Sequence, residues 1–210
     1  MMNTQPRASR QRPKNSMEPR VSITTQDYPE DCSRLLTAMQ RLHRREYRSP
    51  LEAIPDLISF FGFRLGRRML PPHQWALTDF GKKEVWLCSE LAAKLEIPSV
   101  AREVEAFSLA HELAHVRLHQ HLDEFNDLHE KEADAYAACF LMPIRLLRLA
   151  PAFSRFLRAE TQGAMSQEVS ALAQRFGVSR SAMTYRLCSL GVLRVVSGRW
   201  VKVSSREVMQ

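Results

Sequence analysis

The stretch VAREVEAFSLAHELAHVRLH, residues 100–119, decides how the middle of the chain folds. It contains neither proline nor glycine, and its apolar residues recur at three- and four-residue intervals, which predicts one amphipathic helix. Pro98 and Ser99 stand just before it and are typical of a helix start. Residues four apart share a helix face, so His111 and His115 present two imidazoles side by side.

The segment HELAH, residues 111–115, fits the HExxH pattern of zinc peptidases. His111 and His115 are the predicted metal ligands, because two histidines at this spacing can bind one zinc ion. Glu112 is the predicted general base, since it lies beside a ligand and can take a proton from a metal-activated water. The alternative is a chance arrangement in a chain with 7 histidines, and a third ligand would decide between the two.

A second stretch, EKEADAYAACFLMP at residues 130–143, also predicts a helix, which Pro143 ends. Glu130 and Asp134 are four residues apart and share a face of it. In this arrangement Glu130 supplies the third ligand, and Asp134 accepts the free ring N–H of a ligating histidine. Glu132 remains the alternative third ligand, because it lies only two residues from Glu130.

Two further histidines follow the motif. His121 stands where a metzincin would have its third histidine, but Leu118 replaces the glycine that permits the required turn. On a continued helix His121 points away from His111 by about 280°. His119 stays on the stripe of His111 and His115 one turn further along, and we expect it to be partly exposed.

Together the two motifs resemble the ImmA/IrrE metallo-endopeptidases. In that family HExxH is followed by an acidic helix written roughly ExEAN-x-FA-x-x-LLMP. The corresponding residues of this chain are Glu130, Glu132, Ala133, Asp134, Tyr136, Ala137, Leu141, Met142 and Pro143. Asp134 stands where asparagine is usual and Tyr136 where phenylalanine is usual. Asp134 also matches the broader gluzincin pattern ExxxD, which favours Glu130 over Glu132 as the ligand. The resemblance covers about residues 51–193.

The resemblance implies a zinc-dependent endopeptidase, with Mn²⁺ as the alternative metal. Its implied substrate is a partner helix-turn-helix repressor, cut in a linker so that repression of stress or mobile-element genes is relieved. One alternative is a non-enzymatic regulator that holds a structural metal and binds DNA or a repressor. The intact Glu112 speaks against it, because a structural site needs no general base. Another alternative is a toxin-like module neutralised by an antitoxin.

Composition gives the setting. The 210 residues carry a formal charge of +7, and the four cysteines fit neither a CxxC pair nor a disulfide framework, which indicates free thiols in a reducing cytoplasm. No apolar run reaches the ~18 residues of a membrane span. A basic N-terminus without a following apolar region does not indicate a signal peptide. We therefore expect a cytoplasmic protein without a membrane partner.

The predicted fold class is α+β. We expect a disordered basic tail at 1–27, a metallopeptidase-like domain at 28–160 and a helix-turn-helix-like unit at 161–210. Alternating apolar residues near 75–77 and 85–87 predict a small antiparallel sheet in the helical metallopeptidase domain. The residues from Pro143 to about Ala159 read as one basic helix.

The stretch ALAQRFGVSRSAMTYRL, residues 171–187, looks like a helix-turn-helix. Two apolar runs around Ser197 and Gly198 predict a hairpin after it, as in a winged helix. If this unit bound DNA, the contacting side chains would be Arg180, Ser181, Thr184 and Tyr185. Because ImmA/IrrE proteins carry a similar segment as part of the body beside the cleft, DNA stays an alternative partner.

Overall fold

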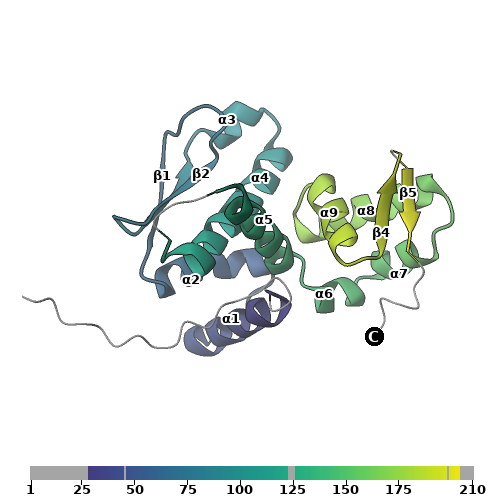
Figure 1. Cartoon of the computed structure of the whole chain (residues 1–210), viewed down its shortest axis with the longest axis horizontal. Helices are drawn as coiled ribbons and strands as arrows, with labels where there is room; N and C mark the ends of the chain where they lie inside the picture. Colours follow the sequence, from purple (N-terminus) through teal and green to yellow (C-terminus); the bar gives the residue numbers. More distant parts are fainter. Residues whose placement is uncertain (1–27, 45, 123–125, 198, 204–210) are drawn as a thin grey trace, which may run out of the picture.

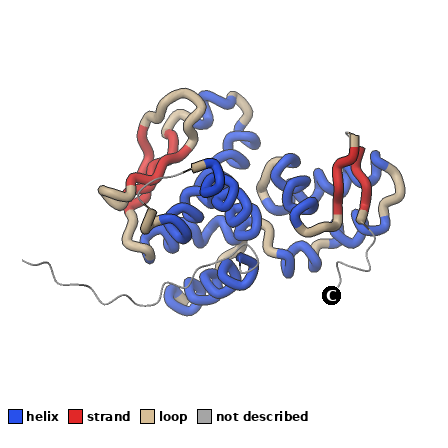
Figure 2. The backbone as a smooth tube through the Cα atoms, in the orientation of Figure 1, coloured by secondary structure: helices blue, strands red, loops and turns tan. Residues whose placement is uncertain are grey.

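The chain forms two lobes that lie side by side along its long axis (Figure 1). This computed structural model describes residues 28–44, 46–122, 126–197 and 199–203. A small sheet lies in each lobe, toward opposite ends of the molecule, and helices fill the space between them (Figure 2). The tail predicted at residues 1–27 lies outside the described residues.

The first lobe packs helices against a three-stranded sheet. Its elements are α1 (Tyr28–His43), the 3-10 turn η1 (Pro50–Ala53), α2 (Ile54–Phe60), β1 (Arg64–Arg68), β2 (Ala76–Asp79), β3 (Glu84–Cys88), α3 (Leu91–Leu95), α4 (Pro98–Ala114), the π-helical turn η2 (His115–His119) and α5 (Asp127–Leu141). Pro98 opens α4 at a position where no backbone N–H is needed. The helix predicted over 100–119 is therefore α4 followed by a widened π turn.

The second lobe is a helical unit with a hairpin. Its elements are α6 (Ile144–Leu149), α7 (Pro151–Arg158), α8 (Gln162–Phe176), α9 (Arg180–Ser189), β4 (Leu193–Val196) and β5 (Arg199–Lys202). The prediction of one helix from Pro143 to about Ala159 is wrong. Pro151 has no N–H to donate and begins a new helix, and Ala150 before it is extended.

The α+β prediction is confirmed, and the first sheet is mixed. β2 and β3 pair antiparallel, as predicted, with Ala76 opposite Leu87 and Asp79 opposite Glu84. The structure adds β1, which pairs with β3 in parallel, so the strand order is β1-β3-β2 and β2 lies at an edge. Gly66 on β1 permits this pairing, because a Cβ there would come within 2.5 Å of the Trp86 ring.

In the second lobe α8 and α9 are joined by a tight turn. Gly177 takes a left-handed conformation (φ 64°) that ends α8, and the Ser179 side chain accepts the Ala182 N–H to cap α9. The β4–β5 hairpin follows in antiparallel register. Helix, turn, helix and hairpin thus lie in the predicted order, while the resemblance to a winged helix and the domain boundaries stay predictions.

One apolar core includes buried residues of both lobes. At their junction Arg186 on α9 is 6 % exposed, and its Nε donates to the Met142 carbonyl oxygen just beyond α5 at 3.1 Å. Its Nη2 lies 3.4 Å from Cys139 Sγ on α5. The second lobe is therefore fastened to the end of α5.

Within the described residues no single helix has the length and apolar character of a membrane span, although the bent pair Asp127–Leu149 and Pro151–Arg158 passes on length and composition when its two parts are taken together.

Candidate metal centre and peptide cleft

Two histidines converge where α4 passes into η2. His111 lies in the last turn of α4 and His115 begins the π turn, and their Nε2 atoms are 2.9 Å apart. His115 is buried and His111 is half-buried. Both rings thus direct the same nitrogen to one point.

Glu130 brings a carboxylate to that point from α5. Its Oε2 lies 3.1 Å from His111 Nε2 and its Oε1 3.4 Å from His115 Nε2. Asn126 caps α5, accepting the backbone N–H groups of Leu128 and His129, and so fixes the turn that carries Glu130.

One donor atom from each of the three residues lies within 4.8 Å of the others, the only such cluster among the described residues. Two imidazole nitrogens and one carboxylate oxygen are a donor set that suits zinc. The role of these residues as ligands stays a prediction.

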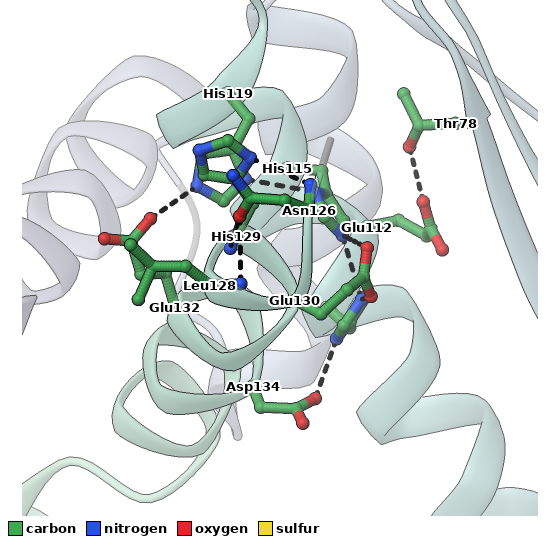
Figure 3. Close-up of polar contacts among 11 residues, drawn as sticks. Thr78, Glu112, His115, His119, Asn126, Leu128, His129, Glu130, Glu132 and Asp134 are labelled. Carbon is green, nitrogen blue, oxygen red and sulfur yellow. Dashed lines mark hydrogen bonds and ion pairs between the residues drawn. The ribbon is translucent and has the colours of Figure 1, made fainter. Parts of the chain in front are cut away.

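The second nitrogen of each ring has a partner of its own. His111 Nδ1 lies 2.9 Å from Asp134 Oδ1, at the position predicted for the acceptor of a ligand's N–H. His115 Nδ1 lies 3.0 Å from His119 Nδ1, and His119 Nε2 lies 3.1 Å from Glu132 Oε2. His119 is 3 % exposed, so the expectation that it is partly exposed is wrong, because the π turn and α5 enclose it. Figure 3 shows Glu130 at the cluster and Glu132 on the side of His119.

Burial and nearby charges shift the pKa values of His111 and His115 in opposite directions. Burial, together with the nearby histidine rings, lowers the pKa of His115 to about 3. Burial acts in the same direction on His111, but its hydrogen bond with Asp134 and the surrounding carboxylates outweigh it and raise the pKa of His111. Neutral imidazole is the form that binds a metal.

Glu112 lies beside the cluster without joining it. It is 7 % exposed, and its Oε2 accepts a hydrogen bond from Thr78 Oγ1 on β2 at 2.6 Å (Figure 3). Burial raises the pKa of Glu112, and the Thr78 hydrogen bond and the His111 charge offset part of that rise. A carboxyl group with a raised pKa is suited to general-base work. Thr78 is absent from the sequence prediction because no motif links it to a residue 34 positions away.

A cleft of about 390 Å³ opens over these groups. One wall is formed by residues 73–78 and Phe80, which include the edge strand β2. The other wall consists of residues of α4, η2 and α5, namely Phe107, Ser108, His111, Glu112, His115 and Glu130. Trp75, Leu77, Phe80 and Phe107 make much of the wall apolar. An edge strand beside a cleft offers unpaired backbone groups to an extended peptide.

Residues 98–188 match the family model Peptidase_M78, described as the IrrE N-terminal-like domain. This part of the chain is similar to that family. The resemblance predicted from HExxH and ExxxD is therefore confirmed, and the IrrE-like region runs from the start of α4 into α9.

A solved structure is similar in fold to this chain. It is a "Mycobacterium tuberculosis transcriptional regulator", with a TM-score of 0.52 and 19% sequence identity. The match covers 79% of this chain and 47% of that one, so this chain spans about half the length of the regulator. No curated protein matches the sequence.

Near the three-residue cluster, Asp31 on α1 holds the π turn. Arg117 donates to both Asp31 oxygens, at 3.1 and 2.7 Å, and Tyr136 Oη donates to Oδ2 at 2.6 Å. Tyr136 is fully buried, so it lies in the core, as expected, and outside the cleft. His121 is exposed and is not part of the three-residue cluster.

The four predicted DNA contacts lie on α9 in varied surroundings. Arg180 donates to Ser166 Oγ at 2.6 Å and lies over the Trp200 ring, 5.2 Å from its centroid. Thr184 Oγ1 donates back to the Arg180 carbonyl oxygen. Ser181 and Tyr185 are exposed. Their role in DNA contact stays a prediction.

Proposed function

We propose that this chain is a metal-dependent endopeptidase of the ImmA/IrrE type that cuts a partner helix-turn-helix repressor. The observation that carries the proposal is Glu112, a buried carboxylate held by Thr78 in the cleft wall, beside three potential ligands and separate from them. A structural metal site has no use for such a group.

His111, His115 and Glu130 would hold the metal. Their donor atoms fit a divalent cation, and contacts at the Nδ1 atoms orient the two rings so that both Nε2 atoms face one point. A bound Zn²⁺ or Mn²⁺ supplies Lewis-acid activation of water and of the scissile carbonyl group.

The chain's own residues perform the rest. Glu112 accepts the proton of the attacking water and passes it to the leaving amine nitrogen. Thr78 keeps the Glu112 carboxylate directed along the cleft. The substrate lies extended and pairs with the free edge of β2, while the apolar wall accepts its side chains. An exposed interdomain linker of a repressor meets these demands, because it can become extended without unfolding a domain.

The test compares the wild type with Glu112→Gln, which keeps shape and hydrogen bonding but cannot take a proton. Each is incubated with Zn²⁺ or Mn²⁺ and two probes: a small helix-turn-helix repressor encoded near this chain's gene, and a mixed library of unstructured peptides. Fragments are read by mass spectrometry. The wild type should cut, and Glu112→Gln should be slower by about 10²–10⁴-fold while keeping its metal.

Glu103→Gln is the matched control, since it changes the same residue type on α4 outside the cleft, and it should cut like the wild type. Cleavage of the library but not of the repressor would contradict the proposed substrate and support the proposed peptidase activity. The absence of fragments from both probes, or equal rates for Glu112→Gln and the wild type, would contradict the peptidase.

A second candidate function is a DNA-binding regulator, and the charge of the second lobe favours it. Residues 144–203 contain ten arginines and lysines against two glutamates, a formal charge of +8. Binding of a mixed-sequence duplex, measured by fluorescence anisotropy at 50 and 200 mM salt, tests it. A DNA-binding regulator should bind the duplex with an affinity that falls steeply as salt rises. Tyr185→Ala and Arg194→Ala should each weaken this binding. If the duplex is not bound even at 50 mM salt, this candidate fails.

A further inference from the structure

Two polar side chains beside the metal centre have no part in the proposed reaction. His119 is buried in the π turn, and Glu132 lies on the face of α5 that covers it. Figure 3 shows His115, His119 and Glu132 in a row that leads away from the cluster, on the side opposite Thr78. Two contacts join the row, 3.0 Å between the Nδ1 atoms of His115 and His119 and 3.1 Å between His119 Nε2 and Glu132 Oε2.

Hydrogen-bond chemistry assigns the protons along this row. An ionised carboxylate only accepts, so the proton between Glu132 and His119 belongs to His119 Nε2. A neutral ring protonated there has a lone pair at Nδ1, so His119 Nδ1 accepts from the Nδ1–H of His115. His115 then has its lone pair at Nε2, the atom that faces Glu130 and His111. One carboxylate therefore sets the tautomers of two rings in succession.

The backbone favours the same arrangement. The π turn η2 places the His115 and His119 rings with centroids 5.1 Å apart, and Arg117 within that turn is fixed to Asp31 on α1. Wide turns of this kind occur often at functional sites. The ring nitrogens of His119 are thus held between two helices and not at the surface.

We propose that His119 and Glu132 form a positioning relay that presents Nε2 of His115 to the metal, as Asp134 does directly for His111. The relay rests on the proposed metal centre, and neither residue touches the metal or the substrate. Glu132 then has a role distinct from that of Glu130, although both come from one ExExD motif. Each ligand histidine is oriented by its own carboxylate, one of them through a second imidazole.

The first test reads tautomers, and it needs neither metal nor substrate. The full chain, labelled with ¹⁵N, is examined metal-free by long-range ¹H–¹⁵N correlation of the histidine rings. His115 should carry its proton at Nδ1 and His119 at Nε2. Glu132→Gln should mix these forms, because an amide can donate as well as accept. Asp127→Asn, which removes an exposed carboxylate of the same helix, should leave them unchanged. His115 protonated at Nε2 in the wild type would overturn the relay.

The second test measures Zn²⁺ affinity by competition with a chromophoric chelator. Glu132→Gln and His119→Phe should weaken Zn²⁺ binding by about 10–100-fold, and Asp127→Asn should not change it. His119→Phe alters the core and can fail to fold. In that case Glu132→Gln decides the test, because the Glu132 side chain is 33% exposed and its replacement leaves the core intact.

The outcomes separate the relay from the proposed function. If Glu132→Gln binds Zn²⁺ as tightly as the wild type and still cuts, only the relay is overturned. If Glu132→Gln loses the metal as fully as Glu130→Ala, Glu132 is a ligand and the relay is again overturned. If the wild type binds neither Zn²⁺ nor Mn²⁺, both proposals fall.

Discussion

The two lobes place their charged groups in opposite ways. In the first lobe Glu112 and His115 are buried and His111 is half-buried. The two histidines meet Glu130 at one point, and each ring nitrogen there has a partner. In the second lobe most of the ten cations lie at the surface, and Arg186 is the buried one. Burying an ionisable group is unfavourable unless other groups satisfy it. Convergent burial therefore distinguishes the candidate site, whereas scattered surface charge is compatible with solvation or with a polyanionic partner.

The largest expected effect is on metal binding. Glu130→Ala removes a proposed ligand and should weaken Zn²⁺ binding by more than the roughly 10–100-fold typical of groups that only orient a ligand. Glu132→Ala should remain within that range, which separates the two candidates for third ligand. Isothermal titration or chelator competition measures both. The ligand assignment is wrong if Glu132→Ala strips the metal while Glu130→Ala retains it.

A smaller effect is expected at Thr78. Thr78→Val keeps the shape of the edge strand and removes the hydroxyl that donates to Glu112. A hydrogen bond to a charged group contributes ~1.5–3 kcal/mol, so kcat should fall by about 10–100-fold with little change in KM or metal content. Thr78→Ser should restore most of the rate, because it returns the donor. A rise in KM with unchanged kcat would instead show that Thr78 acts on substrate binding.

The smallest effect concerns the second lobe. Arg186→Met leaves the Met142 carbonyl oxygen without its buried donor and should lower the free energy of unfolding by about 1–3 kcal/mol. Arg199→Met, on the exposed hairpin, should change it by less than about 0.5 kcal/mol. Urea unfolding of the full chain compares the two. Equal effects on the free energy of unfolding would show that the buried and the exposed arginine contribute alike, contrary to this prediction.

The features that sequence predicted well are local ones. His111, Glu112 and His115 share one helix, and Glu130 and Asp134 share another, so helical spacing alone places each set on a face. The antiparallel pair β2–β3 is similarly local, because a short turn joins its strands. Pro151 is a local signal for the start of α7, because proline ends one helix and can begin another. The prediction of one continuous helix over this stretch did not take that signal into account.

The features that sequence did not predict depend on distant contacts. The parallel pairing of β1 with β3 and the Thr78–Glu112 hydrogen bond join segments without any shared pattern. The burial of His119 depends on a π turn held by Asp31, 86 residues from Arg117, and helical periodicity assumes that no such turn exists. The fold class and the place of Asp134 beside His111 were therefore accessible from sequence, whereas the contacts of Thr78 and His119 were not.

The attachment of Arg186 has a mechanical consequence. Glu130 lies in the first turn of α5 and Cys139 in its last turn. At the usual helical rise the two residues are about 13 Å apart along the helix axis. Arg186 contacts the C-terminal end of α5 through Cys139 Sγ and the Met142 carbonyl oxygen. Any rotation of the second lobe would therefore act on the same helix that presents Glu130 to the two histidines of the neighbouring helix.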